Sequence, residues 1–220
     1  MKMMAIDAKQ IADAITRQPT FEQACAIDKV LTERRRVARM RAAAANRVGY
    51  DSPWLVLQVV SGRELSVREA LEKENIEVLV PMKMGPVVRR QHRVIPAKQQ
   101  PVMNGYVLVR CAVLNECLAG LLSFDHVVSI LGGYEAPFLV SAEKVYLFKA
   151  KAEDGKYDYE HFHRKFIGVK WARVADGPFA GCRAELVSGG TKGNGLVVIE
   201  LSIMGRPVAM TVPIAILEPL

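Results

Sequence analysis

The sequence predicts an α+β protein with a helical N-terminal extension, an α/β sandwich and a small β-barrel at its C-terminal end. Residues 1–48 carry apolar side chains at helical spacing, and residues 54–150 alternate between strand-like and helix-like segments. Residues 168–220 contain only short strand-like segments. We therefore expect four parts: a basic helical extension over 1–50, a first domain over 51–150, a linker over 151–167 and a barrel over 168–220.

Composition limits the class of protein. The chain has 220 residues, of which 50% are hydrophobic, enough for one or two domains with their own cores. No run of 18 apolar residues predicts a membrane span, and the first residues lack the apolar core of a signal peptide, so we expect a cytoplasmic protein with no membrane partner. The four cysteines form no CxxC pair and are expected to be free thiols.

Positive charge is concentrated near the N-terminus. The net charge is +7, and residues 1–50 hold 10 Lys and Arg against 5 Asp and Glu, whereas residues 51–160 hold 13 against 14. Such an excess promotes contact with nucleic acid but does not by itself identify a partner.

The N-terminal extension is predicted to contain a long helix that Thr20 caps. Arg34, Arg35 and Arg36 lie on this helix. They are either a solvated basic face or a contact for phosphate groups, which guanidinium groups bind in a bidentate manner. Gly49 to Pro53 then mark a boundary.

Residues 54–150 are predicted to form the sandwich, because strand-like and helix-like segments succeed one another in the order β-α-β-β-β-α-β, with a last helix after them. The expected strands are 54–60, 76–80, 87–95, 105–111 and 127–131, and the expected helices begin near Ser61, Leu114 and Ser141. In the barrel the expected strands are 168–174, 184–188, 196–203 and 207–212.

The segment Asp176-Gly177-Pro178-Phe179-Ala180-Gly181 follows a short apolar strand and precedes another. Asp-Gly-Pro is a tight turn with a fixed φ at the proline, and an aromatic side chain follows it. This pattern resembles a KOW motif of an SH3-like barrel. Ala184 stands where most such motifs carry a glycine.

Together with the preceding domain, the chain resembles the NusG family of transcription elongation factors. Trp54, Gln58 and Ser61-Gly62 match the family's first strand, and Met103-Asn104-Gly105-Tyr106 matches its Phe-Pro-Gly-Tyr, with the first two residues departing. Residues 127–133 match its Val-x-x-Ile-Gly-Gly with one extra residue. The resemblance covers about residues 54–220 and implies an NGN-type sandwich followed by a KOW barrel.

The resemblance also implies a mechanism. The first domain would bind the clamp helices of the RNA polymerase largest subunit in an apolar pocket, and would thereby suppress pausing or modulate termination. By position, Trp54, Met103, Tyr106 and Ile130 would line that pocket. The alternative is that Trp54, Tyr106 and Ile130 only pack in the core.

In the family the KOW domain recruits a second partner, the termination factor Rho or a small-subunit ribosomal protein. Phe179 and Ile203 are the expected contacts, although Phe179 can instead close the end of the barrel. With its N-terminal extension and its departures at Met103, Asn104 and Ala184, the chain resembles a specialised, RfaH-like paralogue. Such a paralogue would act in the bacterial cytoplasm and associate with the nucleoid during transcription. Such members contact the non-template DNA strand, for which the candidates are Arg63, Arg68, Arg89, Arg90 and Arg93.

Other functions find less support. His161 and His163 offer two ligands where a zinc site needs four, and the glycine-rich segment 189–195 does not follow the P-loop pattern. No catalytic constellation is visible, so we expect no enzyme, no metal and no cofactor. An RNA-binding KOW protein of ribosome or ribonucleoprotein type, without polymerase binding, is the alternative function.

Overall fold

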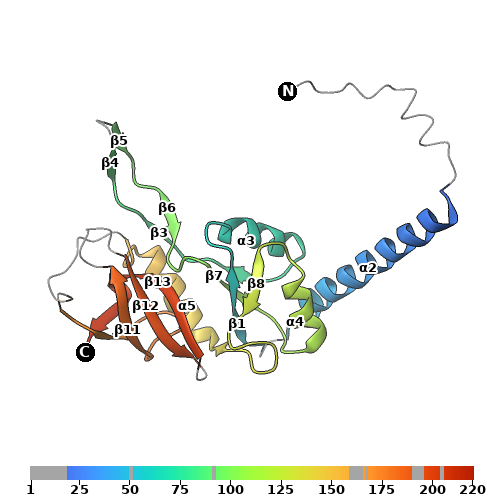
Figure 1. Cartoon of the computed structure of the whole chain (residues 1–220). Coiled ribbons are helices and arrows are strands. Elements are labelled where there is room, and N and C mark those ends of the chain that lie inside the picture. The colour runs from blue at the N-terminus through green and yellow to red at the C-terminus, as the bar shows by residue number, and fades with distance from the viewer. Residues whose placement is uncertain are drawn as a thin grey trace. The chain divides into compact units, whose positions relative to one another are not determined.

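The computed structural model describes residues 19–49, 52–90, 93–158, 166, 168–189, 196–203 and 206–220. The chain divides into two compact units, residues 1–39 and 40–220. Helix α2 (Phe21–Asn46) begins in the first unit and ends in the second (Figure 1). Thr20 caps it as predicted: the Thr20 hydroxyl accepts from the Gln23 amide, and the Gln23 side chain accepts from the Thr20 amide.

A five-stranded sheet, which we call the central sheet, organises the first half of the second unit. Its strand order is β2-β7-β1-β8, and β9 also pairs with β1. All of these pairings are antiparallel. The strands are β1 (Trp54–Val59), β2 (Val78–Leu79), β7 (Tyr106–Arg110), β8 (Val127–Ile130) and β9 (Leu139–Val140).

Alternation along β1 and β7 gives the central sheet two buried faces. Leu55, Leu57 and Val107 point to a cluster that contains residues of α3 (Glu64–Lys73) and α4 (Asn115–Leu122). The last turns of α2 join this cluster through Ala44, and Gly120 of α4 lies against the backbone of Met40. Burial on both faces explains the near-continuous apolar run of β1.

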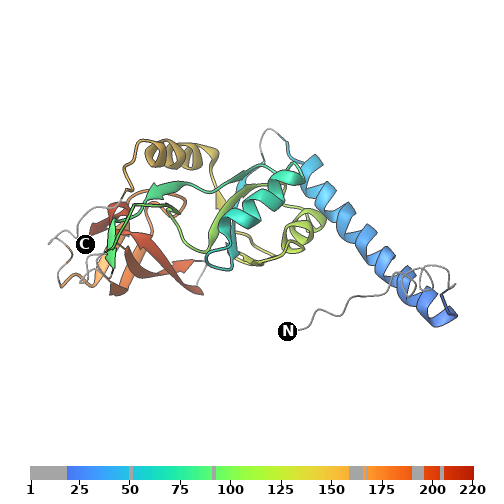
Figure 2. The same ribbon diagram turned by 90° about the horizontal axis from the view of Figure 1, so that it is seen from above.

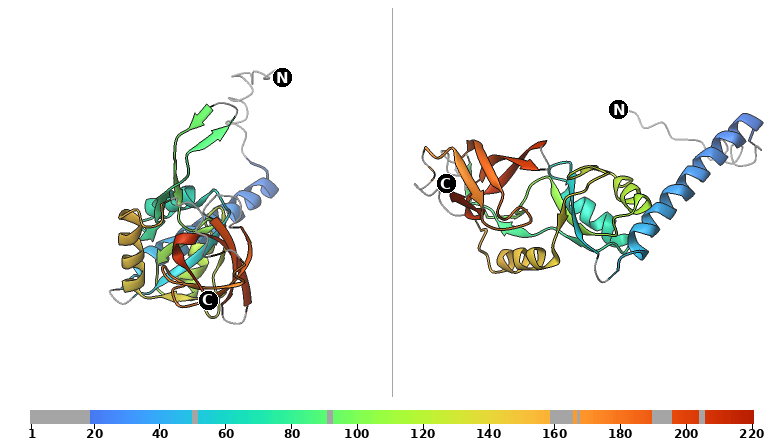
Figure 3. Two further views of the ribbon diagram at one scale, coloured as in Figure 1. Left: turned by 90° about the vertical axis from the view of Figure 1, so that its left-hand side faces the viewer. Right: turned by 90° about the horizontal axis from the view of Figure 1, so that it is seen from below.

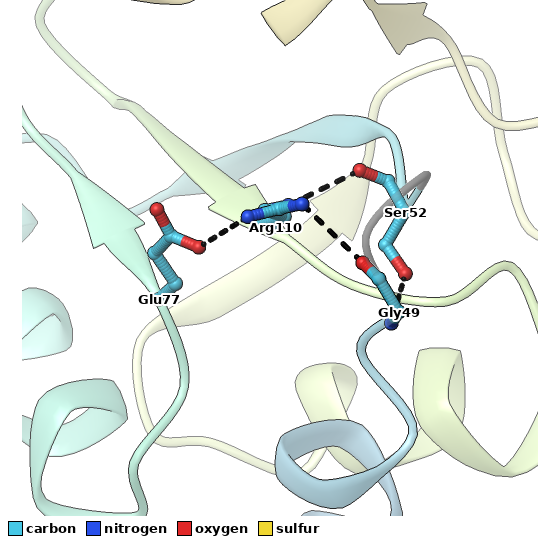
Figure 4. Close-up of polar contacts among 4 residues, drawn as sticks. All are labelled: Gly49, Ser52, Glu77 and Arg110. Atoms are coloured by element: carbon cyan, nitrogen blue, oxygen red, sulfur yellow. Dashed lines mark hydrogen bonds and ion pairs between the residues drawn. The ribbon is translucent and has the colours of Figure 1, made fainter.

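Arg110 at the end of β7 binds two backbone groups between α2 and β1. Its guanidinium group donates to the carbonyl oxygens of Ser52 (3.3 Å) and Gly49 (3.3 Å) and to the Glu77 carboxylate (3.1 Å), as Figure 4 shows. The Gly49 amide in turn donates to the Ser52 hydroxyl. A planar donor group can serve several acceptors at once, so a single side chain holds both Gly49 and Ser52 at the end of β7.

The other face of the central sheet packs against helix α5 (Ala142–Glu153) and a second five-stranded antiparallel sheet, the C-terminal sheet (Figures 1 and 2). Its strand order is β13-β12-β11-β10-β14. The strands are β10 (Trp171–Val174), β11 (Arg183–Gly189), β12 (Leu196–Ile203), β13 (Arg206–Pro213) and β14 (Leu217–Pro219), and the short 3-10 helix η2 (Ile214–Ile216) links the last two. The mixed helix and sheet content confirms the α+β prediction.

Residues 82–101 form two small ribbons rather than the single strand expected over 87–95. Strand β3 (Met82–Met84) pairs with β6 (Gln99–Pro101), and β4 (Val88–Arg90) pairs with β5 (Arg93–Ile95). The expectation of one strand was wrong, because Val88–Arg90 and Arg93–Ile95 are two strands that pair antiparallel with each other.

Candidate functional site

Three of the four predicted pocket residues lie together on the face of the central sheet that α5 and the C-terminal sheet cover. Trp54 and Tyr106 come from β1 and β7, and Met103 comes from the loop before β7. Each is buried, with at most 4% of its surface exposed. The Trp54 ring also meets Tyr146 of α5 edge to face, with 6.2 Å between ring centroids. These residues form an apolar site that α5 and the C-terminal sheet cover.

The loop that carries Met103 is held by Glu64, which the sequence analysis missed. The buried Glu64 carboxylate at the start of α3 accepts a hydrogen bond of 2.6 Å from the Gly105 amide. Gly105 has φ +81°, and a Cβ there would lie 3.1 Å from the Ser61 hydroxyl. Only glycine adopts this conformation without strain. Glu64 thus fixes the backbone between Met103 and Tyr106.

Strand β13 of the C-terminal sheet reaches this site directly. The Tyr106 hydroxyl donates to the Ala209 carbonyl oxygen (3.3 Å), and Asn104 forms a β-bridge with Thr211. Burial raises the pKa of Tyr106, so its hydroxyl keeps the proton that it donates. A cavity of about 230 Å³ beside these contacts is lined by residues of both parts, among them Gln58 and Val198. The contacts close the site from the outside.

Ile130 lies elsewhere. It pairs with Leu57, and both belong to the cluster that faces α3 and α4. Paired residues of neighbouring strands share a face of the sheet. The structure therefore does not bring Ile130 together with Trp54, Met103 and Tyr106.

Phe179 and Ile203, the predicted contacts of the predicted KOW domain, are also buried, with 2% and 4% of their surfaces exposed. Both belong to the same apolar cluster as Trp54 and Tyr106. The Phe179 ring packs on Phe138, which lies just before β9, with 5.6 Å between centroids. One continuous core therefore contains both predicted protein-binding sites.

Helix α5 holds the turn that carries Phe179. The Lys151 ammonium group forms an ion pair and hydrogen bond with Asp176, and both side chains are mostly buried. The Lys144 ammonium group donates to the Ala180 carbonyl oxygen (3.5 Å). Gly177 has φ +88°, and a Cβ there would lie 3.3 Å from the Phe148 ring. The turn therefore contacts α5 through an ion pair, a hydrogen bond and close packing against Phe148.

The predicted nucleic-acid contacts are scattered over three elements. Arg34 and Arg35 are exposed on α2, whereas Arg36 pairs with Glu33 (3.1 Å). Arg63 is exposed at the start of α3, and Arg68 pairs with Glu72 (3.6 Å). Arg89, Arg90 and Arg93 belong to the β4–β5 ribbon, where Arg89 and Arg93 are exposed. Helix α2 and the ribbon each carry three of them.

The reactive side chains of the described residues include four cysteines. All four cysteines are free thiols: Cys111 and Cys117 are buried, and burial raises the pKa of Cys111 to about 12. A thiol with so high a pKa is a poor nucleophile. The described part of the chain holds no cluster of three metal-binding side chains and no helix of the length and apolarity that crossing a bilayer requires. His161 and His163 lie outside the described residues.

Comparison with known proteins identifies the central part of the chain. Residues 52–149 match the model of the NusG family, described as transcription termination factor nusG. No curated protein matches the sequence. A solved structure entitled "Domain interaction in Thermotoga maritima NusG" matches with 17% identity over 77% of this chain and 98% of that chain, with a TM-score of 0.39. The MjSpt4:Spt5 complex in conformation A matches with 16% identity over 76% of this chain and 97% of that chain, with a TM-score of 0.24. The same complex in conformation B matches with 17% identity over 76% of this chain and 96% of that chain, with a TM-score of 0.27. Residues 52–149 thus form a domain that matches the NusG family.

Proposed function

We propose that this protein is a transcription elongation or antitermination factor that binds the clamp helices of RNA polymerase through Trp54, Met103 and Tyr106. The observation that carries the proposal is the convergence of these three apolar side chains on one face of a NusG-family domain. Aromatic and methionine side chains are the usual anchors for a helix in an apolar groove. Ile130 has no part in this proposal, because it lies on the other face.

The C-terminal sheet, in this proposal, is a KOW domain of SH3-like type that recruits Rho or a small-subunit ribosomal protein through Phe179 and Ile203. The protein acts without a catalytic step and without a metal or cofactor. Exposed arginines supply contacts to nucleic acid, as in a specialised paralogue of bacterial cytoplasm. The departures at Met103 and Asn104 and the presence of α2 support the specialised role.

Binding then requires the C-terminal sheet to leave the central sheet. Met103 and Tyr106 are almost fully buried, and β13 occupies the space beside them. A partner helix gains their apolar surface only after this contact breaks. The apparent affinity for polymerase is reduced by the fraction of molecules in which the site is open.

The test measures binding of the full chain to a purified clamp-helix fragment. Thr211→Arg places a long charged side chain where β13 meets Asn104 and should favour the open form. We expect Thr211→Arg to bind at least tenfold more tightly than the wild type, and Tyr106→Ala to lose the binding in that background. Leu139→Ala, which removes an exposed side chain on β9, is the control. No binding by a folded Thr211→Arg variant would contradict the proposal.

The alternative function, an RNA-binding KOW protein without polymerase binding, rests on the exposed Arg34 and Arg35 of α2. It predicts that Arg34→Gln/Arg35→Gln abolishes RNA binding while the clamp-helix fragment fails to bind any variant. The same binding experiments therefore distinguish the two functions.

A further inference from the structure

A cavity of about 300 Å³ lies between helix α5 and the strands β2, β3 and β6. Helix α5 packs against β3 (Figures 1 and 3). The lining includes Leu79, Met82 and Gln99 from the strands, Ala152 from α5, and Asp158 beyond the helix. This volume is at the lower end of the range that small-molecule sites occupy. Every described residue of the lining lies between positions 79 and 158, so the C-terminal sheet contributes none of them.

Lys83 is the most deeply buried charged side chain of this lining, with 7% of its surface exposed. It stands at the middle of β3, between Met82 and Met84, which are both more exposed. Lysine is seldom buried in this way unless its charge is paired. The cavity therefore offers an uncommon group, a buried ammonium, to a ligand that enters it.

Each of the other charged side chains in the lining has a partner. Lys149 pairs with Glu153 (3.9 Å), and the Asp158 carboxylate accepts a hydrogen bond from the Met84 amide (2.7 Å). The Lys83 ammonium group forms no hydrogen bond and no ion pair with any residue that the structure describes. Burial lowers its pKa to about 8, and the attraction of Asp158 opposes this shift only in part. At neutral pH the group is still charged, and an unpaired buried charge is costly.

We propose that this cavity binds a small monocarboxylate with an apolar body, whose carboxylate group forms an ion pair with Lys83. Such a charge-assisted hydrogen bond is stronger than one between neutral groups, and it would offset the cost of the buried ammonium. Val80 and Met82 supply apolar lining for the body of the ligand, and methionine adapts to irregular shapes. Glu153 and Asp158 also line the cavity, and their negative charge disfavours a dianion such as phosphate.

This inference goes beyond the proposed function, because it adds a small-molecule ligand to a protein for which we propose macromolecular partners. It does not depend on the site formed by Trp54, Met103 and Tyr106, since none of these residues lines the cavity. Ligand binding is therefore expected in the closed form of the full chain and without polymerase. Clamp-helix binding by the Thr211→Arg variant is measured separately, so failure of one proposal does not imply failure of the other.

The test is titration calorimetry of the full chain at pH 7 with three probes: hexanoate, its neutral analogue hexanamide, and inorganic phosphate. We expect hexanoate to bind with a Kd in the millimolar range or tighter, and at least about tenfold more tightly than hexanamide. Lys83→Met removes the costly charge but keeps an unbranched side chain, so the variant should fold. It should nevertheless bind hexanoate at least about tenfold more weakly. Lys98→Met, at an exposed lysine outside the lining, is the matched control and should bind as the wild type does.

A second measurement follows the charge of Lys83 itself. In a ¹³C NMR titration of the lysine Cε groups, the signal that Lys83→Met lacks belongs to Lys83. Saturating hexanoate should raise the midpoint of this signal from about 8 by about one pH unit, because an anion favours the charged amine and a tenfold preference corresponds to one unit of pKa. A purely structural role for Lys83 does not produce this change.

Five results would each overturn the proposal. They are no binding of hexanoate by the wild type, unchanged affinity for hexanoate in Lys83→Met, equal affinity for hexanamide, tighter binding of phosphate than of hexanoate, and a midpoint of Lys83 that hexanoate leaves in place.

Discussion

Two buried polar atoms on the shared core have no partner among the described residues: the Tyr157 hydroxyl and the Trp54 indole nitrogen. Both residues are almost fully buried. A buried polar group without a hydrogen bond costs about 1–3 kcal/mol. Burial, with a smaller effect from Asp176, raises the pKa of Tyr157, so the group stays a neutral hydroxyl.

Tyr157→Phe should therefore leave the free energy of unfolding unchanged or raise it by up to about 1 kcal/mol, because the substitution removes only the unpaired hydroxyl. Urea denaturation measures the change, and Tyr146→Phe, at a half-exposed tyrosine of α5, is the control. A loss above about 1 kcal/mol in Tyr157→Phe would show that the hydroxyl has a partner.

Lys83 on β3 is a second buried polar residue, with 7% of its surface exposed. Burial lowers the pKa of Lys83 from 10.5 to about 8, and the nearby Asp158 carboxylate partly opposes the shift. The same carboxylate accepts a hydrogen bond of 2.7 Å from the Met84 amide. Below pH 8 both folded and unfolded chains carry the proton, and the folded state bears the full cost of burying the charge.

As pH rises from 8 to 10.5, the folded chain loses the proton while the unfolded chain keeps it, so Lys83 contributes a gain in stability. The gain totals about 3 kcal/mol. We expect Lys83→Met to be more stable than the wild type at pH 7 and to lose this advantage by pH 10.5. Unfolding curves across that range measure the difference. Lys98→Met, at an exposed lysine, should show no such convergence, and parallel pH profiles for wild type and Lys83→Met would rule out the buried charge.

The resemblance to the NusG family predicted that Trp54 and Tyr106 lie together, and the structure places both in one apolar cluster. It also grouped Ile130 with them, and this was wrong: Ile130 lies on the opposite face, because its face depends on the register of β8 with β1. That register shifts between Gln58 and Val59, and the local sequence contains no pattern that predicts the shift. Glu64 was missed for a related reason: its partner is the Gly105 amide, distant in sequence.

At the scale of elements, α2 illustrates what local sequence does and does not determine. Thr20 and Gln23 form a capping box that the sequence contains in full. The packing of the C-terminal end of α2 depends on its contacts with α4. A Cβ at Gly120 would overlap the backbone of Met40 and Arg41, 2.7 Å from the Met40 carbonyl carbon. Arg41 also donates to the Ser123 hydroxyl (3.0 Å) and carbonyl (2.6 Å) and lies over the Phe124 ring.

Gly120→Ala should therefore destabilise the protein by about 2–3 kcal/mol, as overpacking against rigid backbone does. Helix propensity alone predicts the opposite sign, a gain of about 1 kcal/mol. Chemical denaturation gives the sign, and amide exchange should show lost protection at residues 40–46 while β1 and β7 stay protected. A stabilised Gly120→Ala variant would mean that α2 does not pack on α4.

The ribbon was missed at this scale because Arg90-Gln91-His92-Arg93 contains neither glycine nor proline nor an Asn-Gly pair. Apolar and β-branched residues flank it on both sides, so the pattern from Val87 to Ile95 is typical of one strand.

At the scale of the whole second unit, the sequence predicted two parts with separate partners, whereas the structure joins them in one apolar cluster. An interface between two domains and the core of one domain are built from the same kinds of apolar side chain. Composition therefore does not distinguish a buried interface residue from a core residue. Phe179 is an example: it is buried, but its ring packs on Phe138 of the first part as well as within its own.

The Lys151–Asp176 ion pair lies between α5 and the C-terminal sheet, and both side chains are less than a third exposed, 25% and 22%. Breaking such a pair leaves one charged side chain largely buried without its partner. This weakens the association of α5 with the C-terminal sheet by about 1–2 kcal/mol. If the proposed polymerase site opens only when this contact breaks, the same free energy appears as a gain of about 5- to 30-fold in apparent affinity for the clamp-helix fragment.

Asp176→Asn should therefore bind the clamp-helix fragment more tightly than the wild type, and Lys151→Asp/Asp176→Lys, which restores an opposite-charge pair, should return towards wild-type affinity. Titration calorimetry on the folded full chains measures both. Because the pair is partly exposed, its effect should also shrink as salt concentration rises. A restored pair that leaves affinity high would show that Asp176 acts within its own turn, and that closure of the site depends on the apolar contacts of Tyr106 and Phe179 alone.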